Sequence, residues 1–291
     1  MKVTRFLWLA LAFLSAGCFA QHKSETSWQE MVKAERAFAA YAQKTNTKQA
    51  FLKFMARNGI KFQKGEAMNA IQLFEALPDT ESNDWLSWWP VFADMASSDD
   101  LGYTYGPWQY FTSKTDSVPT ATGFFSSVWQ KQPNGEWKNL VDLGTSYKTN
   151  FSRTEEVAHA KMPLKKLSAK VDKTQEQAAL IALDKKYIAE LNQQSASFTP
   201  TYYSTEGRIH RPNEAPVIGL NEIRQYQEGD KNFSFSYLNA EVSAAADMAY
   251  TYGKVAVKLP GGRIINANYI RIWKKEDSST WKIILDVIGM S

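Results

Sequence analysis

The phrase DMAYTYGKVAVKL opens residues 247–286, and the phrase WKIILD closes them. An earlier stretch, residues 101–142, opens with LGYTYGPWQYF and closes with WKNLVD. The tetrapeptide YTYG and the closing tryptophan, lysine and aspartate recur in the same order. Repetition over this length predicts two copies of one domain within the chain.

The composition is that of a globular protein. The chain has 291 residues, of which 44% are hydrophobic and 13% aromatic, enough to build the cores of two ordinary domains. The formal net charge is +4; without Lys2 and Arg5 the chain has 32 basic and 30 acidic residues, or +2. An excess this small gives no reason to expect nucleic acid as a partner. Beyond the N-terminus, no stretch approaches the roughly 20 apolar residues of a transmembrane span.

The N-terminal residues are typical of an export signal. A basic start is followed by the apolar run 6–14 and then by small residues. Cleavage after Ala20 fits ordinary signal peptidase, so residues 1–20 are predicted to be a signal peptide. The alternative is a lipobox ending at Cys18, the single cysteine, although Ser15 stands where a large aliphatic residue is normal. The mature protein is expected to be periplasmic or secreted, with a lipoprotein anchored at Cys18 as the alternative.

Residues 24–150 are predicted to form the first domain, with helices before strands. The predicted helices cover 28–42, a segment that Asn46 or Thr47 caps and Asn58-Gly59 ends, and 67–74. The predicted strands cover 88–95, 102–112, 122–131 and 136–142. The turn signal Pro133-Asn134-Gly135 indicates that the last two strands pair antiparallel. Residues 151–173 are interpreted as a linker.

Residues 174–291 repeat this order and are predicted to form the second domain. Its first helix has an apolar stripe from Leu180 to Leu191, Phe198, Tyr202 and Tyr203 belong to a second helix, and 219–223 opens a third. The expected strands cover 234–242, 249–259, 263–274 and 280–288. Helices followed by a meander of strands indicate an α+β fold. The last strand is apolar on both faces, so we expect the two domains to pack sheet against sheet in a monomer.

These motifs resemble the nuclear transport factor 2-like superfamily, in its branch of SnoaL-like and ketosteroid-isomerase-like domains. The second copy carries RPNEAPVIG, residues 211–219, and a closing hairpin with Trp273 and Trp281; the first carries LGYTYGPW and its own hairpin. The resemblance implies two cone-shaped domains, each with about three N-terminal helices packed in a strongly curved antiparallel sheet around a pocket. Members include isomerases, cyclases, dehydratases and proteins with no known chemistry, so the fold alone selects no reaction.

A ketosteroid-isomerase-like site would need a carboxylate base and two hydrogen-bond donors for the enolate. By resemblance, the helix-one tyrosine falls on Tyr187, but the base position falls on Arg211, which cannot accept a proton. The strand that should supply the second donor, 263–272, has no acidic residue. In the first copy, Phe38 and Gln63 stand at these two positions. That particular reaction is therefore not expected.

Two ionisable residues of the second copy remain as candidates for chemistry. The imidazole of His210 suits acid or base work, although a half-exposed strand histidine beside Arg211 is the plainer interpretation. Asp286 could be a buried carboxylate with a raised pKa, but Asp142 repeats it in the first copy, which favours a shared structural hydrogen bond. The histidines lie far apart in the sequence, so no metal site and no cofactor are expected.

Two hypotheses for the function follow. The first is a non-catalytic binding module whose second domain holds a small apolar or aromatic ligand. Its expected lining is Tyr187, Tyr203, His210, Arg211, Tyr252, Asn268, Trp273 and Asp286. The second is an isomerase, dehydratase or hydrolase with His210 as base and with Tyr187 and Arg211 stabilising an oxyanion. The two hypotheses differ in what His210 does.

Overall fold

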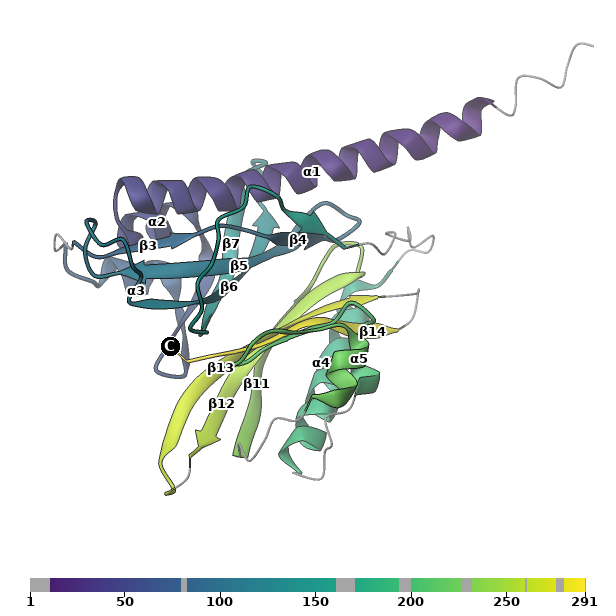
Figure 1. The fold of residues 1–291 in the computed structure, drawn as a ribbon. Coiled ribbons are helices and arrows are strands. Elements are labelled where there is room, and N and C mark those ends of the chain that lie inside the picture. Colours follow the sequence, from purple (N-terminus) through teal and green to yellow (C-terminus); the bar gives the residue numbers. More distant parts are fainter. Residues whose placement is uncertain are drawn as a thin grey trace, which may run out of the picture.

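The chain folds into two sheets with helices on their outer sides (Figure 1). The structure is a computed structural model that describes residues 11–79, 83–160, 171–193, 200–226, 232–259, 261–275 and 280–290. Within these ranges the helices of each half precede most of its strands. The predicted fold class, α+β in two domains, is confirmed.

The first domain is built from the following elements. Its helices are α1 (Leu11–Lys44), α2 (Thr47–Phe54) and α3 (Ala70–Glu75). Its strands are β1 (Met55–Gln63), β2 (Glu66–Asn69), β3 (Trp85–Trp88), β4 (Phe92–Met95), β5 (Leu101–Phe111), β6 (Ala121–Lys131), β7 (Trp137–Ser146) and β8 (Ala158–His159). The strand order is β2-β1-β7-β6-β5-β4-β8, and β3 also pairs with β5.

The second domain repeats the plan, with a shorter first helix and a 3-10 turn in place of the second helix. Its helices are α4 (Lys173–Asn192), the 3-10 turn η1 (Pro200–Tyr202) and α5 (Leu220–Gln225). Its strands are β9 (Arg208–His210), β10 (Val217–Ile218), β11 (Asn232–Val242), β12 (Met248–Lys258), β13 (Ile264–Lys275) and β14 (Trp281–Gly289), in the order β10-β9-β14-β13-β12-β11. Helix α1 lies outside the first sheet, whereas α4 and α5 lie outside the second (Figure 1).

A local signal accounts for where α2 begins, whereas the predicted stop signal does not end it. Asn46 caps the helix, because its side chain accepts a hydrogen bond from the Gln49 backbone N–H at 2.9 Å. Asn58-Gly59, predicted to end this helix, instead lies within β1, where the pairing with β7 is irregular between Met55 and Ile60. The helix is therefore shorter than predicted, and a strand begins directly at its end.

A hairpin replaces the first half of the predicted third helix. Lys64 and Gly65 have positive φ angles of 52° and 83°, which turn β1 back into β2. Helix α3 therefore begins only at Ala70. In the second domain the predicted second helix is reduced to η1, and Phe198, which was assigned to it, lies outside the described residues.

The strand predicted over 88–95 is two strands, β3 and β4. Trp89-Pro90 separates them, because proline has no N–H to continue a ladder. The predicted linker, residues 151–173, contributes the short strand β8, which pairs in parallel with β4. Residues 161–170 of this linker lie outside the described ranges.

Both sheets contain parallel pairs, which corrects the prediction of purely antiparallel sheets. Strand β1 runs parallel to β7, and β9 runs parallel to β14. These pairs place Lys61 beside Asp142 in the first domain and Ile209 beside Asp286 in the second. In each copy, the strand that follows the second helical element, β1 or β9, thus lies next to the strand of the closing WK…D motif, β7 or β14. This pairing brings β1 and β9 close to the aspartate of the closing WK…D motif, which is Asp142 in the first domain and Asp286 in the second.

The facing sides of the two sheets share one apolar cluster. It includes Tyr103 and Tyr105 from β5 and Tyr250 and Tyr252 from β12, which are the tyrosines of the two YTYG motifs. Side chains of β7 and β14 complete the cluster. The repeated tyrosines therefore bury apolar surface between the sheets.

The loops that precede the YTYG motifs contact each other reciprocally. The Ser97 N–H donates to Asp247 Oδ2 at 3.0 Å, and the Ala244 N–H donates to Asp100 Oδ2 at 2.9 Å. These donors hold matching positions in the two copies, as do these acceptors. Such exchange of equivalent contacts is the pattern of a two-fold symmetric interface.

The glycine of each YTYG motif is required by close approach of a neighbouring backbone. A Cβ atom on Gly106 would lie 2.0 Å from the Trp89 carbonyl oxygen. A Cβ atom on Gly253 would lie 2.0 Å from the Ser236 carbonyl oxygen. A residue with a side chain would clash at either position, so close packing of the backbones requires the shared glycine.

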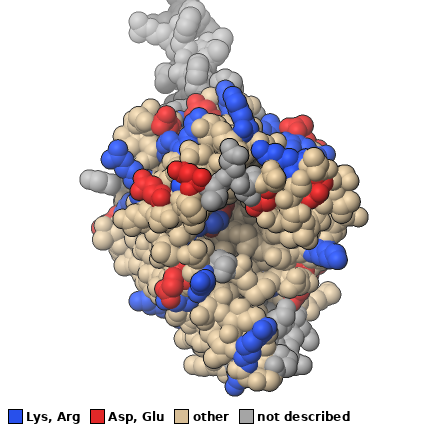
Figure 2. All heavy atoms as spheres, turned by 90° about the vertical axis from the view of Figure 1, so that its left-hand side faces the viewer, with Lys and Arg blue, Asp and Glu red and all other residues tan. Residues whose placement is uncertain are grey.

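The surface charges and the N-terminal helix relate to the predictions about nucleic acid, a membrane span and the signal peptide. Figure 2 shows basic and acidic side chains interspersed on one face of the molecule. Among the residues that the structure describes, no helix is both long and apolar enough to cross a membrane. Of the predicted signal peptide, residues 1–10 lie outside the described ranges, and residues 11–20 are the beginning of α1.

Candidate functional site

Alternation along β13 separates residues that face α4 from residues that face the first domain. Tyr269 and Arg271 reach Asp184 on α4, with hydrogen bonds of 2.8 and 2.7 Å. Asn268 points the other way and donates to the Gly65 carbonyl of the first domain at 3.0 Å. Because successive strand residues point to opposite faces, the odd-numbered positions here collect on the helix side.

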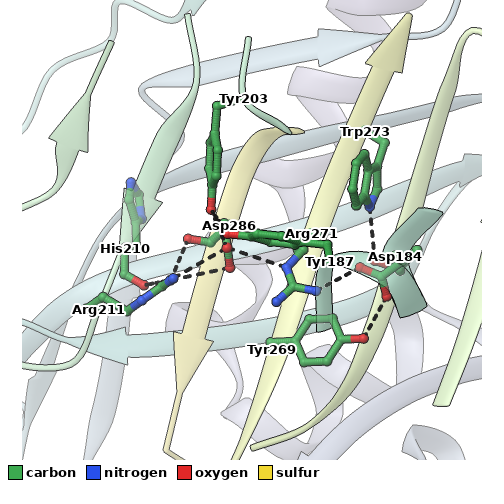
Figure 3. Close-up of polar contacts among 10 residues, drawn as sticks. Asp184, Tyr187, Tyr203, His210, Arg211, Tyr269, Arg271, Trp273 and Asp286 are labelled. Carbon is green, nitrogen blue, oxygen red and sulfur yellow. Dashed lines mark hydrogen bonds and ion pairs between the residues drawn. The ribbon is translucent and has the colours of Figure 1, made fainter. Parts of the chain in front are cut away.

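Four charged side chains form a buried network on that helix side (Figure 3). Arg271 lies between two aspartates: its Nη1 donates to Asp184 Oδ1 at 2.7 Å, and its Nε donates to Asp286 Oδ2 at 3.4 Å. Arg211 donates to both carboxylate oxygens of Asp286 at 3.3 Å. All four side chains are at most 2% exposed. Two positive and two negative charges balance, which is how charges are tolerated in an interior.

Three tyrosines connect this network to the surface. The Tyr203 hydroxyl donates to Asp286 Oδ2 at 2.6 Å and lies 3.1 Å from the Tyr187 hydroxyl. The Tyr187 ring packs against Tyr202, with the centroids 4.5 Å apart. The Tyr202 hydroxyl in turn donates to Glu190 Oε1 at 2.8 Å. A continuous row of tyrosines therefore leads from the outer side of α4 to the buried carboxylate.

The two arginines decide the charge state of Asp286. Burial alone would raise the pKa of this carboxyl group, but Arg211, Arg271 and the hydrogen bond from Tyr203 together lower it. Burial disfavours the charged form of Arg271, but Asp286 and Asp184 more than offset this and raise its pKa. Burial also raises the pKa of Tyr203 well above its ordinary value. Asp286 is therefore an anion held by two cations and by a neutral hydroxyl donor.

Five of the eight residues predicted to line a site meet on this helix side. They are Tyr187, Tyr203, Arg211, Trp273 and Asp286. Trp273 Nε1 donates to Thr251 Oγ1 at 3.0 Å beside the network. The other three, Tyr252, Asn268 and His210, lie on the opposite face of the sheet, toward the first domain.

His210 shows this separation most clearly (Figure 3). Its ring lies against Tyr105 and Phe124 of the first domain, with centroid distances of 5.3 and 5.1 Å. Only its backbone carbonyl accepts a hydrogen bond from Arg211. Burial first, and then the charges of Arg208 and Arg211, lower the pKa of His210 to about 3. The structure does not bring this ring together with the polar groups of the helix side.

Sequence reasoning missed Asp184, Tyr269 and Arg271. Asp184 stands four residues from Leu180 and from Ile188, both buried, so a carboxylate falls on the inner stripe of α4. Arg271 alternates with Tyr269 in the otherwise apolar run YIRIW. A charge at a buried helix position and an opposite charge at a buried strand position together predict an ion pair. Both signals were present in the sequence.

The first domain has its own buried acid at the corresponding place. Glu35 on α1 matches Asp184 on α4, because each precedes the aligned aromatic residue by three positions. Its carboxylate accepts hydrogen bonds from Trp88 Nε1 at 2.7 Å, Trp129 Nε1 at 2.8 Å and Thr104 Oγ1 at 2.6 Å. Burial raises the pKa of Glu35 to about 7, although these donors act to lower it. Neutral donors thus replace the arginine of the second domain.

Glu35→Gln is expected to change stability in a pH-dependent way. The pKa of Glu35 is about 7 in the folded protein, against an ordinary value of 4.5. Between these values the folded state holds a proton that the unfolded chain has released. The contribution of Glu35 to the free energy of unfolding therefore falls by about 3 kcal/mol as the pH rises through this window.

Urea unfolding at several pH values measures this effect as the stability difference between the wild type and Glu35→Gln. Glu30→Gln is the control, because Glu30 is exposed on the same helix. A shift of equal size in both variants, or none in Glu35→Gln, would show that Glu35 does not titrate as proposed.

A groove of about 490 Å³ opens between α4, η1 and the start of β14. The described residues that line it include Leu183, Lys186 and Glu190 from α4, Tyr202 from η1, and Trp281 and Lys282 from β14. The groove lies next to the buried network, because Tyr202, which lines the groove, packs on Tyr187. Within the described ranges, no group of three or more His, Cys, Asp and Glu side chains could hold a metal ion.

Fold and site define an α+β protein with two similar domains, the second of which has a groove beside a buried charged network. The chain matches no protein-family model and no curated protein. Among solved structures it is similar to a ketosteroid isomerase-like protein from Erwinia carotovora atroseptica, with 15% identity, a TM-score of 0.32, and coverage of 40% of this chain and 95% of that one.

Two further solved structures are similar to about the same share of this chain. A nuclear transport factor 2-like protein of unknown function from Pseudomonas putida is 10% identical, with a TM-score of 0.35 and coverage of 40% of this chain and 87% of that one. The epoxide hydrolase/cyclase-like enzyme SalBIII is 10% identical, with a TM-score of 0.32 and coverage of 40% and 92%. Two of the three are named for the ketosteroid isomerase-like and nuclear transport factor 2-like families, which the repeated motifs resemble. The chemistry has to be argued from the residues of this chain.

Proposed function

We propose that this protein binds a small molecule with an apolar or aromatic body in the groove of its second domain, without catalysing a reaction on it. The groove carries the proposal, because its volume of about 490 Å³ falls within the roughly 300–1,000 Å³ of ligand pockets. Leu183, Tyr202 and Trp281 supply aliphatic and aromatic surface, and charged side chains also line the groove. This combination suits recognition by burial of rings with few polar contacts.

The buried network supports binding better than catalysis. Asp286 is held as an anion by Arg211 and Arg271, and Asp184 is paired with Arg271. A general acid or base needs a suitable pKa and contact with its substrate, whereas these carboxylates are fully buried. The alternative function, an isomerase, dehydratase or hydrolase with His210 as base, would need the His210 ring on the side of the groove.

Two further proposals concern the whole chain. Residues 1–20 direct export and are removed after Ala20, which leaves a periplasmic or secreted protein; the alternative is a lipid anchor on Cys18. The two domains pack on each other as a fused pair, and the mature chain is a monomer. The reciprocal loop contacts support this pairing. Intact-mass measurement of the exported protein separates cleavage from lipidation, and light scattering tests the monomer.

Leu183→Gln is expected to weaken binding of 2-naphthamide, a neutral two-ring probe, roughly tenfold, because it removes aliphatic surface from the groove. Isothermal titration calorimetry measures the affinity. The matched control is Leu238→Gln, since Leu238 is 39% exposed on β11 of the same domain and is not among the residues that line the groove. Unchanged affinity in Leu183→Gln would contradict the proposal. Mass spectrometry of small molecules that copurify with the protein would identify its natural ligand.

A further inference from the structure

We infer that the groove of the second domain is built for an aromatic carboxylate, a flat ring system that carries one negative charge. The inference rests on the proposed function and adds the chemical class of the ligand. It follows from where the charged side chains of the groove lie relative to its apolar walls.

The order of residues along α4 separates the apolar part of the groove from the charged part. Ala179, Leu183, Lys186 and Glu190 follow one side of the helix at spacings of three and four residues. With a rise of 1.5 Å per residue they cover about 16 Å, enough for two fused rings and a polar group. The apolar residues Ala179 and Leu183 come first along this line, and the two charged residues come after them.

Aromatic side chains from two other elements face this side of α4. Trp281 is 6% exposed, and its Nε1 donates to Glu176 Oε2 at 3.3 Å. Tyr202 is 9% exposed and donates to Glu190. Both rings are therefore fixed by packing and by a hydrogen bond before any ligand arrives. The parts of these side chains that reach the groove are thus held in place, so a rigid planar ligand that contacts them loses little conformational freedom on binding.

Two lysines and one glutamate line the groove, which leaves one positive charge in excess. Lys282 Nζ donates to the Thr201 carbonyl at 2.6 Å. This bond fixes the ammonium group, which has three N–H donors in all and so has others for a ligand. Lys186 projects from α4 into the same groove. A carboxylate between the two lysines would gain charge-assisted hydrogen bonds from both.

Glu190 limits the ligand to a single negative charge. It lies about one helical turn beyond Lys186, near the C-terminal end of α4, where the helix dipole is negative. Its neighbour Tyr202 stays protonated, because burial and the hydrogen bond to Glu190 raise the pKa of Tyr202 to about 12. A second anionic group on the ligand would face this acid, so a monoanion fits better than a dianion.

The test compares three two-ring probes by isothermal titration calorimetry on the whole protein. They are 2-naphthoate with one negative charge, 2-naphthamide with none and 2,6-naphthalenedicarboxylate with two. We expect 2-naphthoate to bind roughly tenfold tighter than either of the others, with an advantage over the amide that shrinks as salt is added.

Variants of the lysines assign this preference to the groove. Lys186→Gln combined with Lys282→Gln should abolish the preference for 2-naphthoate and leave the affinity for 2-naphthamide unchanged, which also shows that the groove is intact. Lys185→Gln is the matched control, because Lys185 is adjacent on α4 but its ammonium group lies over the Tyr237 ring, 5.0 Å from the centroid. This control should keep the preference.

Equal affinities of the wild type for 2-naphthoate and 2-naphthamide would overturn the ligand class and leave the proposed function standing. The class is also overturned if Lys185→Gln loses the preference as the double variant does, since the preference would then reflect overall charge. If none of the three probes binds, the proposed function fails and the class fails with it.

Discussion

Arg271→Met is expected to lower the free energy of unfolding by about 3–5 kcal/mol. Methionine keeps apolar volume between the rings of Tyr187 and Tyr269, which lie 4.6 and 4.2 Å from the guanidinium carbon, but it removes the cation. Asp184 and Asp286 then remain in the interior without the charge that lies between them. A buried carboxylate that loses its partner keeps its full desolvation penalty. Urea unfolding measures the loss.

Arg263→Met is the matched control for this prediction, because Arg263 is exposed just before β13. Its effect should stay within about 0.5 kcal/mol. Asp286 keeps its ion pair with Arg211 in Arg271→Met, so the uncompensated charge is mainly that of Asp184. Combining Arg271→Met with Asp184→Asn should therefore recover part of the loss. If Arg271→Met costs less than about 1 kcal/mol, or if the two changes add without coupling, the network does not stabilise the second domain in this way.

His210→Phe is expected to make the protein more resistant to acid, by about 3 kcal/mol at pH 4 relative to pH 6.5. The pKa of His210 is about 3 in the folded protein, against an ordinary value of 6.5, chiefly because of burial. Below pH 6.5 the unfolded chain takes up a proton that the folded state does not, so the histidine lowers stability as the pH falls. Phe62, at the matching position of the first copy, packs against Tyr252 as His210 packs against Tyr105.

The pH dependence of Glu35 has the opposite sign over much of the same range, so the two groups partly cancel in the wild type. His210→Phe alone should expose the contribution of Glu35, which falls with rising pH, and Glu35→Gln alone should expose that of His210, which rises. The double variant should show neither contribution. His159→Phe is the control, because His159 is exposed. If the loss of stability at low pH is the same in His210→Phe as in the wild type, the histidine is not buried between the domains.

The repeated motifs predicted most of the fold. YTYG identified two strands, because its tyrosines face the other sheet and its glycine admits a neighbouring carbonyl. The closing WK…D motif identified β7 and β14, the matching strands of the two copies. The repetition favoured a shared structural hydrogen bond for these two aspartates. In the structure Asp142 forms an ion pair with Lys61, and Asp286 forms ion pairs with Arg211 and Arg271.

Only part of the site could be predicted, because the sequence pattern does not show which face of the sheet lies toward the helices. Both faces of the second sheet are buried, so Tyr252 and Asn268 looked as suitable as Tyr203 and Trp273 for lining a pocket. His210 was placed beside its neighbour Arg211, although consecutive strand residues point apart. The groove depends on how η1 and β14 lie against α4, which spacing along the sequence does not reveal.

The reciprocal contacts between the sheets determine how the two halves can differ. In a dimer of identical chains, every substitution at the interface appears twice, so an unfavourable residue acts twice. Here one covalent chain supplies both faces, so Phe62 and His210 can occupy matching positions. The covalent link also holds the faces at a high effective concentration. Asymmetry is therefore tolerated: the first half can keep a Glu35 that is held by neutral hydrogen-bond donors, while the second acquires paired arginines and a groove.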